Sequence, residues 1–410
     1  EEEFVLNASI TSFLFAGAMV GTLILGPLGD RIGRKPILWW SGFIISVAGL
    51  GTSVCTGYAQ LIPVLFMVGF GVGGLTVPFD ILAEFLPTEE RGRYLLYIKY
   101  FWTLGCMIVP AVGYLSLEVF DSWRLFAALC AIPSIISTVI GVRFVPESPR
   151  WLVSKGRGEE ALSILRDGAM KNGLDPEVIF PNGCVLADEE KDESNFAELL
   201  SPKWRNLTLL LWVVWGGYAF SYYAAIMTVT RIFDEEDDNA GPDFDYMAIF
   251  ISSCAEVVGT ALAISQVDVL GRRPTLVASF ALAGVSMFFL CLLSGHAAPR
   301  ITLIALAFAA RAFEMAGACV AWISTAELLS TEIRATGHSA ANAVARLGGF
   351  SAPFLVEGKS SIVVVGFVLL AVNTATAICS SLLPETKGIE MGKAALLKEE
   401  EKQKHVPPII

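Results

Sequence analysis

Long apolar runs separated by polar segments make up most of the chain. A run of about 20 apolar residues is long enough to cross a bilayer as a helix. Such runs fall near residues 9–28, 37–56, 61–83, 94–116 and 124–144 and, after a long polar stretch, near 207–230, 247–266, 274–294, 300–322, 337–356 and 361–383. The pattern therefore predicts an all-α, polytopic membrane protein with five spans before the polar stretch and six after it.

Composition supports a membrane protein. Hydrophobic residues make up 54% of the 410 residues, and a soluble protein of this composition would expose more apolar surface than water tolerates. We therefore expect the lipid bilayer as the main partner and no nucleic acid. Only Cys184 lies in a polar loop, and the cysteines show neither zinc-site nor disulfide spacing. No metal or cofactor is predicted.

Three motifs occur twice at a nearly constant offset. DRIGRKP (30–36) recurs as DVLGRRP (268–274), EFLPTEER (84–91) as ELLSTEIR (327–334), and PESPR (146–150) as PETKG (384–388). Repeats of this length indicate two homologous halves in parallel register.

The two halves differ by one helix. The first motif follows the second apolar run of the second half, whereas in the first half it follows the first run. The sequence also begins EEEFVLN, without a methionine. We expect one further span before Glu1, so that the sequence is a truncated form of a twelve-span protein.

Most lysines and arginines lie in the motif loops, the 145–206 region and the tail, which places these segments on the cytoplasmic side. The opposite side has one long acidic loop, 234–245. Within 145–206, the segments 159–174 and 196–206 are predicted to be amphipathic helices. The predicted domains are an N-terminal bundle (1–144), a cytoplasmic linker (145–206), a C-terminal six-helix bundle (207–383) and a cytoplasmic tail (384–410).

The paired loops, with PESPR closing one half and PETKG the other, resemble the major facilitator superfamily. PFDILAEFLPTEERGR (78–93) and AVARLGGFSAPF (343–354) look most like its synaptic-vesicle-2-related and organic-ion-transporter branch. The resemblance spans nearly the whole chain. It implies two pseudo-symmetric bundles, with 11 of 12 transmembrane helices present, that move a substrate by alternating access. It also implies a multi-pass protein of the plasma membrane or an intracellular vesicle membrane.

Two alternatives remain. PESPR and PETKG also occur in sugar porters, but the expected glutamine and asparagine are absent from YIKYFWTLGCM (97–107) and WVVWGGYAFSYYAAIMT (212–228). A sugar or polyol carrier is therefore the second alternative. The first is a transporter-fold receptor or vesicle protein that no longer transports. An enzyme is not expected, because the three histidines are scattered and no nucleophile has a visible base.

Charges inside apolar runs are the clearest candidates for a substrate site, because each costs about 2.5–3.5 kcal/mol to insert. Arg311 and Glu314 lie three residues apart and could instead neutralise each other. Tyr222 and Tyr223 belong to an aromatic stripe suited to a ring-bearing organic ion or zwitterion. The predicted substrate-binding residues are Asp80, Lys99, Tyr222, Tyr223, Glu256, Arg311, Glu314 and Arg346. A coupled proton at Asp80, Glu256 or Glu314 remains open.

By resemblance, the repeated motifs form a cytoplasmic gate. Asp30 and Arg34 are expected to latch against acids and cations of the other motifs and against the region near Thr336. The second-half residues mirror them. The predicted gate residues are Asp30, Arg34, Glu84, Arg91, Glu147, Asp268, Arg272, Glu327 and Arg334. The alternative is a set of static surface ion pairs.

Glycines within the apolar runs have a simpler interpretation. Gly69, Gly71 and Gly74 spell a dinucleotide-binding pattern, but they lie in the middle of a span rather than between a strand and a helix. The spacing of Gly17 and Gly21 instead favours close helix packing.

Overall fold

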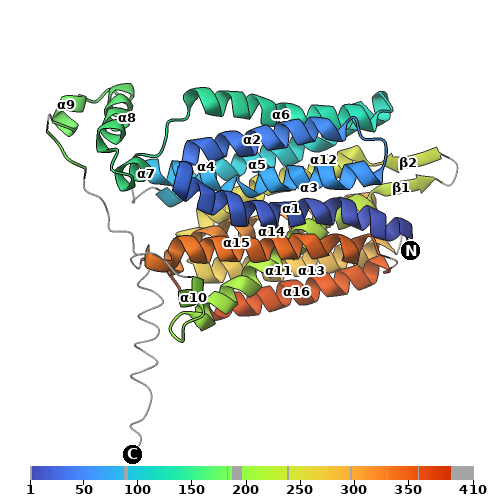
Figure 1. Cartoon of the computed structure of the whole chain (residues 1–410). Coiled ribbons are helices and arrows are strands. Elements are labelled where there is room, and N and C mark those ends of the chain that lie inside the picture. The colour runs from blue at the N-terminus through green and yellow to red at the C-terminus, as the bar shows by residue number, and fades with distance from the viewer. Residues whose placement is uncertain are drawn as a thin grey trace, which may run out of the picture. The chain divides into compact units, whose positions relative to one another are not determined.

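The computed structural model describes residues 2–86, 91–181, 183–186, 196–237, 240–295, 298–329, 331–358 and 360–388. Its helices are α1 (Glu2–Ile32), α2 (Arg34–Thr52), α3 (Tyr58–Gly73), α4 (Thr76–Phe85), α5 (Arg91–Gly113), η1 (Tyr114–Val119), α6 (Trp123–Phe144), α7 (Pro149–Ser154), α8 (Gly158–Lys171), α9 (Pro176–Ile179), α10 (Phe196–Leu199), α11 (Arg205–Ile232), α12 (Tyr246–Val267), α13 (Arg272–Ser294), α14 (Arg300–Leu328), α15 (Thr331–Val356) and α16 (Ile362–Leu382) (Figure 1). Strands β1 (Asp234–Asp237) and β2 (Ala240–Phe244) form an antiparallel pair.

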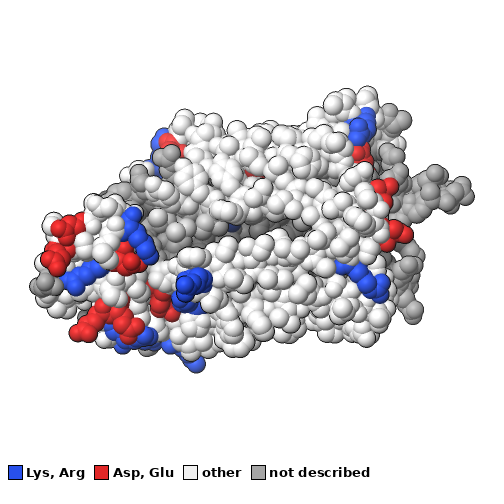
Figure 2. Space-filling model, turned by 90° about the horizontal axis from the view of Figure 1, so that it is seen from above, with Lys and Arg blue, Asp and Glu red and all other residues white. Residues whose placement is uncertain are grey.

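The predicted all-α membrane fold is confirmed. Helices cover all of the predicted apolar runs, and within the described residues nine helices are long and apolar enough to cross a membrane. Figure 2 shows charged side chains gathered mainly toward the helix ends, while the flanks between them show few. Large apolar side chains such as Val139 on α6 and Phe367 on α16 are more than half exposed. These flanks suit contact with lipid.

Three local predictions need correction. The 61–83 run contains a turn at residues 74–75, because α3 ends at Gly73 and α4 begins at Thr76, where glycines weaken the helix, but Tyr58–Phe79 is still one candidate membrane span. The predicted helix at 196–206 is a single turn, α10, because Pro202 disfavours helical backbone just before it. The acidic 234–245 loop contains the β1–β2 pair. The amphipathic helix predicted at 159–174 is present as α8.

The chain packs into two compact units. The larger unit comprises residues 1–15, 96–126 and 193–410, and the smaller unit comprises 16–95 and 127–192. Residues 1–15 and 96–126 therefore pack with the second half of the chain. The predicted domain boundaries remain a prediction.

Helices α11 to α16 form most of the larger unit. In it, α13 packs against α14 and α16, α12 packs against α14, and α11 packs against α15 and α16 (Figure 1). Trp215 and Phe280 are fully buried in its core. The start of α1 joins this unit, where the Ser12 hydroxyl donates a 2.8 Å hydrogen bond to the carbonyl oxygen of Phe350 on α15.

Glycines set the helix spacing in the smaller unit. A Cβ atom on Gly17 or Gly21 of α1 would overlap the carbonyl oxygen of Phe66 or Phe70 on α3, respectively. From the other side, a Cβ on Gly73 would overlap the backbone of α1. The backbones therefore approach as closely as the small-residue spacing predicts.

Replacing Gly21 by alanine would push α1 away from α3. We expect a loss of about 1–3 kcal/mol, the usual cost of overpacking, and a lower unfolding temperature of the detergent-purified protein. Gly26→Ala on the same helix is the matched control, because nothing lies within 4 Å of the added methyl group. Equal unfolding temperatures for the two variants would contradict the close approach.

Candidate functional site

The repeated motifs build the same turn in both units. Gly33 and Gly271 are the N-cap residues of α2 and α13, with φ angles of 115° and 99°. Glycine adopts this region without the strain that a side chain would cause. A carboxylate lies against each glycine, since a Cβ on Gly271 would come 2.8 Å from Glu385 Oε2 and one on Gly33 would meet Glu147. Glycine is therefore required both for backbone conformation and for space.

Those carboxylates cap the helices that follow the turns. Glu147 accepts hydrogen bonds from the backbone N–H of Arg34 at 2.9 Å and of Lys35 at 3.2 Å. Glu385 accepts equivalent bonds from Arg272 at 2.9 Å and Arg273 at 3.0 Å. A negative charge at a helix N-terminus satisfies free N–H groups and the helix dipole. The glutamates of PESPR and PETKG thus hold the ends of α2 and α13.

The capping bonds affect the acidity of Glu385. Burial raises the pKa of its carboxyl group, but hydrogen bonds from four backbone N–H groups outweigh that effect, so the net pKa lies below its usual value. Hydrogen bonds to the ionised form stabilise it. Glu385 is therefore a carboxylate at neutral pH.

Acids and arginines of the motifs also meet within each unit. Arg34 pairs with Asp30 at 2.7 Å and lies 3.6 Å from Glu84. In the second half, Arg272 pairs with Asp268 at 3.1 Å and forms two 2.9 Å hydrogen bonds with Glu327. A bidentate arginine–carboxylate pair is strong and directional.

These contacts unite most of the predicted gate residues of each half. The side chains of Arg91 and Arg334 lie outside the described residues. A latch from Asp30 and Arg34 to the region near Thr336 stays a prediction.

Within the larger unit, Arg311 forms an ion pair with a different partner from the one that sequence spacing suggests. Its guanidinium lies 2.6 Å from Glu256 on the neighbouring helix α12, and both residues are less than 5% exposed. Glu314 projects instead toward α11 and α16. The proposed neutralisation within α14 is wrong, because the helix orientation places the two side chains against different neighbours.

A hydrogen-bond chain extends from this ion pair into α5. The Tyr222 hydroxyl donates to Glu256 Oε1 at 3.0 Å and accepts from the Trp102 indole N–H at 2.8 Å. Trp102 belongs to the first half of the sequence and Tyr222 to the second. The structure therefore connects two predicted substrate residues, Tyr222 and Glu256, to a helix of the other half.

Glu314 is held by neutral groups alone among the described residues. Its Oε1 atom accepts hydrogen bonds from the Ser221 hydroxyl and, at 2.9 Å, from the Asn373 amide. Its Oε2 atom has no hydrogen-bond partner there. Glu314 is 2% exposed, so its carboxyl group is buried without a neighbouring cation.

Lys99 lies among aromatic side chains. Its Nζ atom is 4.0 Å from the ring centroid of Trp322 on α14, within cation–π range. The Trp322 indole N–H donates to the Tyr218 hydroxyl at 3.2 Å. The rings of Trp215 and His338 lie 5.0 and 4.9 Å from Trp322. We call Lys99, Trp215, Tyr218, Trp322 and His338 the aromatic cluster.

Arg346 and Tyr223 border this cluster. Arg346 lies near Tyr223 and near Lys99, and the positive charges of Arg346 and Lys99 repel each other. The Tyr223 ring stands 4.5 Å from that of Phe15. Among described side chains, no carboxylate lies within ion-pair distance of Lys99 or Arg346. The Asp80 side chain lies outside the described residues.

Four residues that contact the predicted site residues were not predicted from the sequence: Trp102, Ser221, Trp322 and Asn373. Three are uncharged polar or aromatic residues of the kind that also pack helices. Only Asn373 gave a usable signal, as the single side-chain amide within α16.

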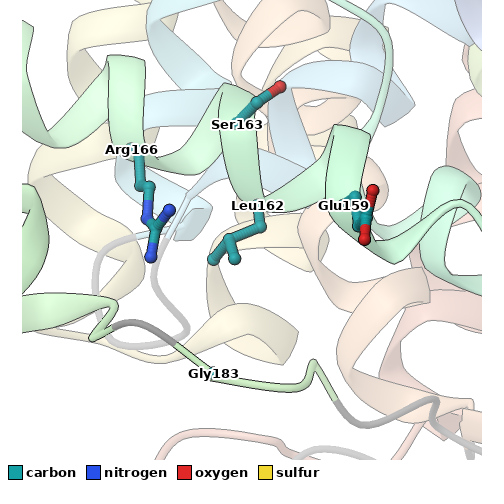
Figure 3. A pocket seen from close by; sticks show the side chains of 5 residues that line it. All are labelled: Glu159, Leu162, Ser163, Arg166 and Gly183. Carbon is teal, nitrogen blue, oxygen red and sulfur yellow. The ribbon is translucent and has the colours of Figure 1, made fainter.

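A separate hollow of about 480 Å³ lies in the smaller unit (Figure 3). It is lined by Glu159, Leu162, Ser163, Arg166 and Gly183. In Figure 3, Leu162 and Arg166 of α8 point toward the segment that contains Gly183. The Arg166 guanidinium already donates to the carbonyl oxygen of Phe180, at 2.7 and 3.2 Å. The hollow contains none of the predicted substrate residues.

Known sequences match this chain over nearly its whole length. Residues 2–395 match the family model described as "Sugar (and other) transporter". The putative transporter svop-1 of Caenorhabditis elegans is 29% identical over 94% of this chain and 76% of its own length. The synaptic vesicle 2-related protein of Rattus norvegicus is 29% identical over 93% of this chain and 72% of its own length. The organic cation/carnitine transporter 7 of Arabidopsis thaliana is 30% identical, covering 93% and 84%.

Solved structures show the same fold. A proton:xylose symporter of the major facilitator superfamily, bound to 6-bromo-6-deoxy-D-glucose, matches with a TM-score of 0.69 and 22% identity, covering 96% of this chain and 89% of that one. The partially occluded, inward-open xylose transporter from E. coli gives a TM-score of 0.71 with 20% identity, covering 95% and 89%. At this identity the likeness concerns architecture alone.

The two buried glutamates should respond differently to neutralisation. Glu256→Gln leaves Arg311 buried without a counter-ion. We expect this to lower the free energy of unfolding by about 3–5 kcal/mol. Glu314→Gln removes no ion pair and keeps an oxygen for Ser221 and Asn373, so its unfolding temperature should stay near wild type. Thermal unfolding in detergent at pH 7 checks this order.

The control for these variants is Glu256→Gln combined with Arg311→Met, which removes both charges and should recover much of the lost stability. Failure of the double variant to recover, together with a large loss in Glu314→Gln, would contradict the assignment of partners.

Acidification should weaken the cap at Glu385. Because its pKa is lower in the folded protein than in the unfolded chain, the carboxylate stabilises the fold above the unfolded pKa. That contribution disappears as pH falls through the lowered pKa. Glu385→Gln should therefore unfold at a lower temperature than wild type at pH 7, with the difference shrinking toward pH 4.

Glu118→Gln, at an exposed position in η1, serves as the control for the pH series. Melting curves of wild type and both variants between pH 7 and pH 4 provide the measurement. A gap between wild type and Glu385→Gln that widened with acid would refute the capping role.

Proposed function

The chain belongs to the sugar (and other) transporter family, in the synaptic-vesicle-2-related branch of the major facilitator superfamily, and we propose that it carries a small organic ion or zwitterion by alternating access. It is an integral multi-pass membrane protein and not an enzyme.

One observation supports the proposal most. Lys99 of α5 lies over Trp322 of α14, so a charged group from the first half meets an aromatic group from the second half. Alternating access requires a site that both halves share, because each half must be able to move away from it. The hydrogen bond from Trp102 to Tyr222 joins the halves in the same way.

The chemistry of the cluster favours an organic ion over a sugar. Trp322 and, at its edge, Tyr218 offer aromatic surfaces, while Lys99 and Arg346 offer charge. Sugar recognition relies instead on several amide and hydroxyl partners, and the xylose transporters share only the fold with this chain. A relative named organic cation/carnitine transporter supports the charged class.

The repeated motifs supply the proposed cytoplasmic gate. The pairs Arg34–Glu84 and Arg272–Glu327 hold helix ends together within each half, so that each half moves as one piece. Contacts between the halves then form and break around the site.

If a proton is coupled to transport, Glu314 is its best-placed carrier among the described acids. Glu256 faces Arg311, and protonating it would leave that arginine uncompensated. Glu314 has neutral partners only, so it can gain or lose a proton without breaking an ion pair.

Uptake by the purified protein in liposomes tests the carrier proposal. The probes are benzenesulfonate, phenyltrimethylammonium, phenylalanine as a zwitterion, and glucose. We expect saturable uptake and counterflow of at least one charged probe and none of glucose. Binding without counterflow for all the charged probes would favour the non-transporting receptor, and saturable glucose uptake would favour the sugar carrier.

Trp322→Leu tests whether the cluster is the site. Loss of the aromatic face should reduce uptake of the transported probe by roughly tenfold, as expected for a desolvated aromatic contact of about 1.4 kcal/mol. Trp40→Leu is the control, because Trp40 is 45% exposed on the flank of α2. Equal uptake by Trp322→Leu and Trp40→Leu would remove the cluster from the substrate path.

A further inference from the structure

Resting on the carrier function proposed above, we propose that the substrate is a single-ring organic anion whose acidic group binds between Lys99 and Arg346 while its ring packs against Trp322 and Tyr218. Carboxylate and sulfonate groups share the required chemistry. The proposal depends on which buried charges already have partners.

Among the described side chains, compensation of the other charges leaves a local excess of positive charge. Glu256 neutralises Arg311 at 2.6 Å. Glu314 points toward Ser221 and Asn373, away from the aromatic cluster. Lys99 and Arg346 therefore have no carboxylate partner among the described side chains. Two like charges that repel each other at mid-helix positions are unfavourable in a low-dielectric setting.

The two cationic side chains are partly exposed. Lys99 and Arg346 are both intermediate in exposure, although each lies within an apolar run. The buried Nε atom of Arg346 has no hydrogen-bond partner, and neither does the buried Nε2 atom of His338 in the aromatic cluster. These are nitrogen positions that an acceptor oxygen would satisfy. An anionic head group supplies both negative charge and acceptor oxygens.

The aromatic side chains indicate what lies behind the acidic group. Lys99 rests on the face of Trp322, a contact that is weaker than a charge pair in the same surroundings. An anion can therefore draw the ammonium group toward itself and leave the indole face for its own ring. Tyr218 is held against Trp322 by a hydrogen bond and forms the edge of this surface.

A cationic substrate fits poorly. It would approach Lys99 and Arg346 directly, while Glu256 already binds Arg311 and Tyr222 through Oε1 and has only its buried Oε2 atom left for a cation. Like charges brought together in a water-poor site oppose binding. The described side chains therefore give the proposed site a net positive charge.

A charge series on one molecular shape tests this sign. Benzenesulfonate, benzenesulfonamide and phenyltrimethylammonium carry a tetrahedral head on the same phenyl ring, with negative, neutral and positive charge. We expect wild-type protein in liposomes to take up benzenesulfonate at least tenfold faster than either other probe. Lys99→Gln and Arg346→Gln should each reduce that uptake about tenfold, whereas Lys99→Arg and Arg346→Lys should retain most of it.

Lys203→Gln, at an exposed position, is the control for loss of one positive charge. Each variant is compared with wild type by size-exclusion chromatography and melting temperature before uptake is measured. Lys99→Glu provides a reversal, since it should lower benzenesulfonate uptake and raise uptake of phenyltrimethylammonium.

The outcomes separate this inference from the carrier proposal. Saturable uptake of phenyltrimethylammonium or phenylalanine without benzenesulfonate would leave the carrier intact and overturn the anion site. Unchanged benzenesulfonate uptake in Lys99→Gln and Arg346→Gln would also overturn it. Binding of benzenesulfonate that depends on Lys99 and Arg346, without counterflow, would support the anion site and overturn the carrier proposal.

Discussion

Compensation of charge inside the hydrocarbon region governs the arrangement of this molecule. An uncompensated ion is costly there, so each buried charge either finds a partner or faces a space that a partner can enter. Arg311 and Glu256 satisfy the first condition and thereby fix α14 against α12. Tyr222 and Trp102 extend that network to α11 and α5. Once these helices are fixed, Lys99 lies over Trp322 with no described acid beside it, and this is the reason we propose a positively charged substrate site.

The duplicated motifs form the same helix cap in both halves of the chain. The turn before α2 or α13 leaves backbone N–H groups free at a helix start. A glycine with positive φ makes room there, and a glutamate from a segment more than a hundred residues later accepts the bonds. The first and last motifs of each half are therefore parts of a single cap. This cap ties the beginning of a half to its end, which suits a unit that moves as a rigid body.

The sequence was enough to predict features that the bilayer determines. It was not enough to predict contacts that depend on how each helix is rotated about its axis. Span length follows from membrane thickness and the sorting of charge from the side of the membrane, so the helices and their orientation were predictable. The repeat was visible in the recurring motifs. The buried charges were visible as well, because they interrupt apolar runs. The choice of partner was not, because a spacing of three residues brings Arg311 near Glu314 on one helix, yet the rotation of α14 directs them to α12 and to α11 and α16. The neutral partner Ser221 gave little warning, since hydroxyl groups also serve ordinary helix packing, whereas Asn373 stood out as the single side-chain amide within α16.

The proposed anion site links binding to movement. With the site empty, closing both halves around Lys99 and Arg346 would bury two repelling cations. A bound anion removes most of that repulsion, so the closed arrangement becomes more favourable only when substrate is present. A ligand shifts a conformational equilibrium only through such differential stabilisation. The shortage of negative charge among the described side chains around Lys99 and Arg346 would therefore select the substrate and make closure depend on it.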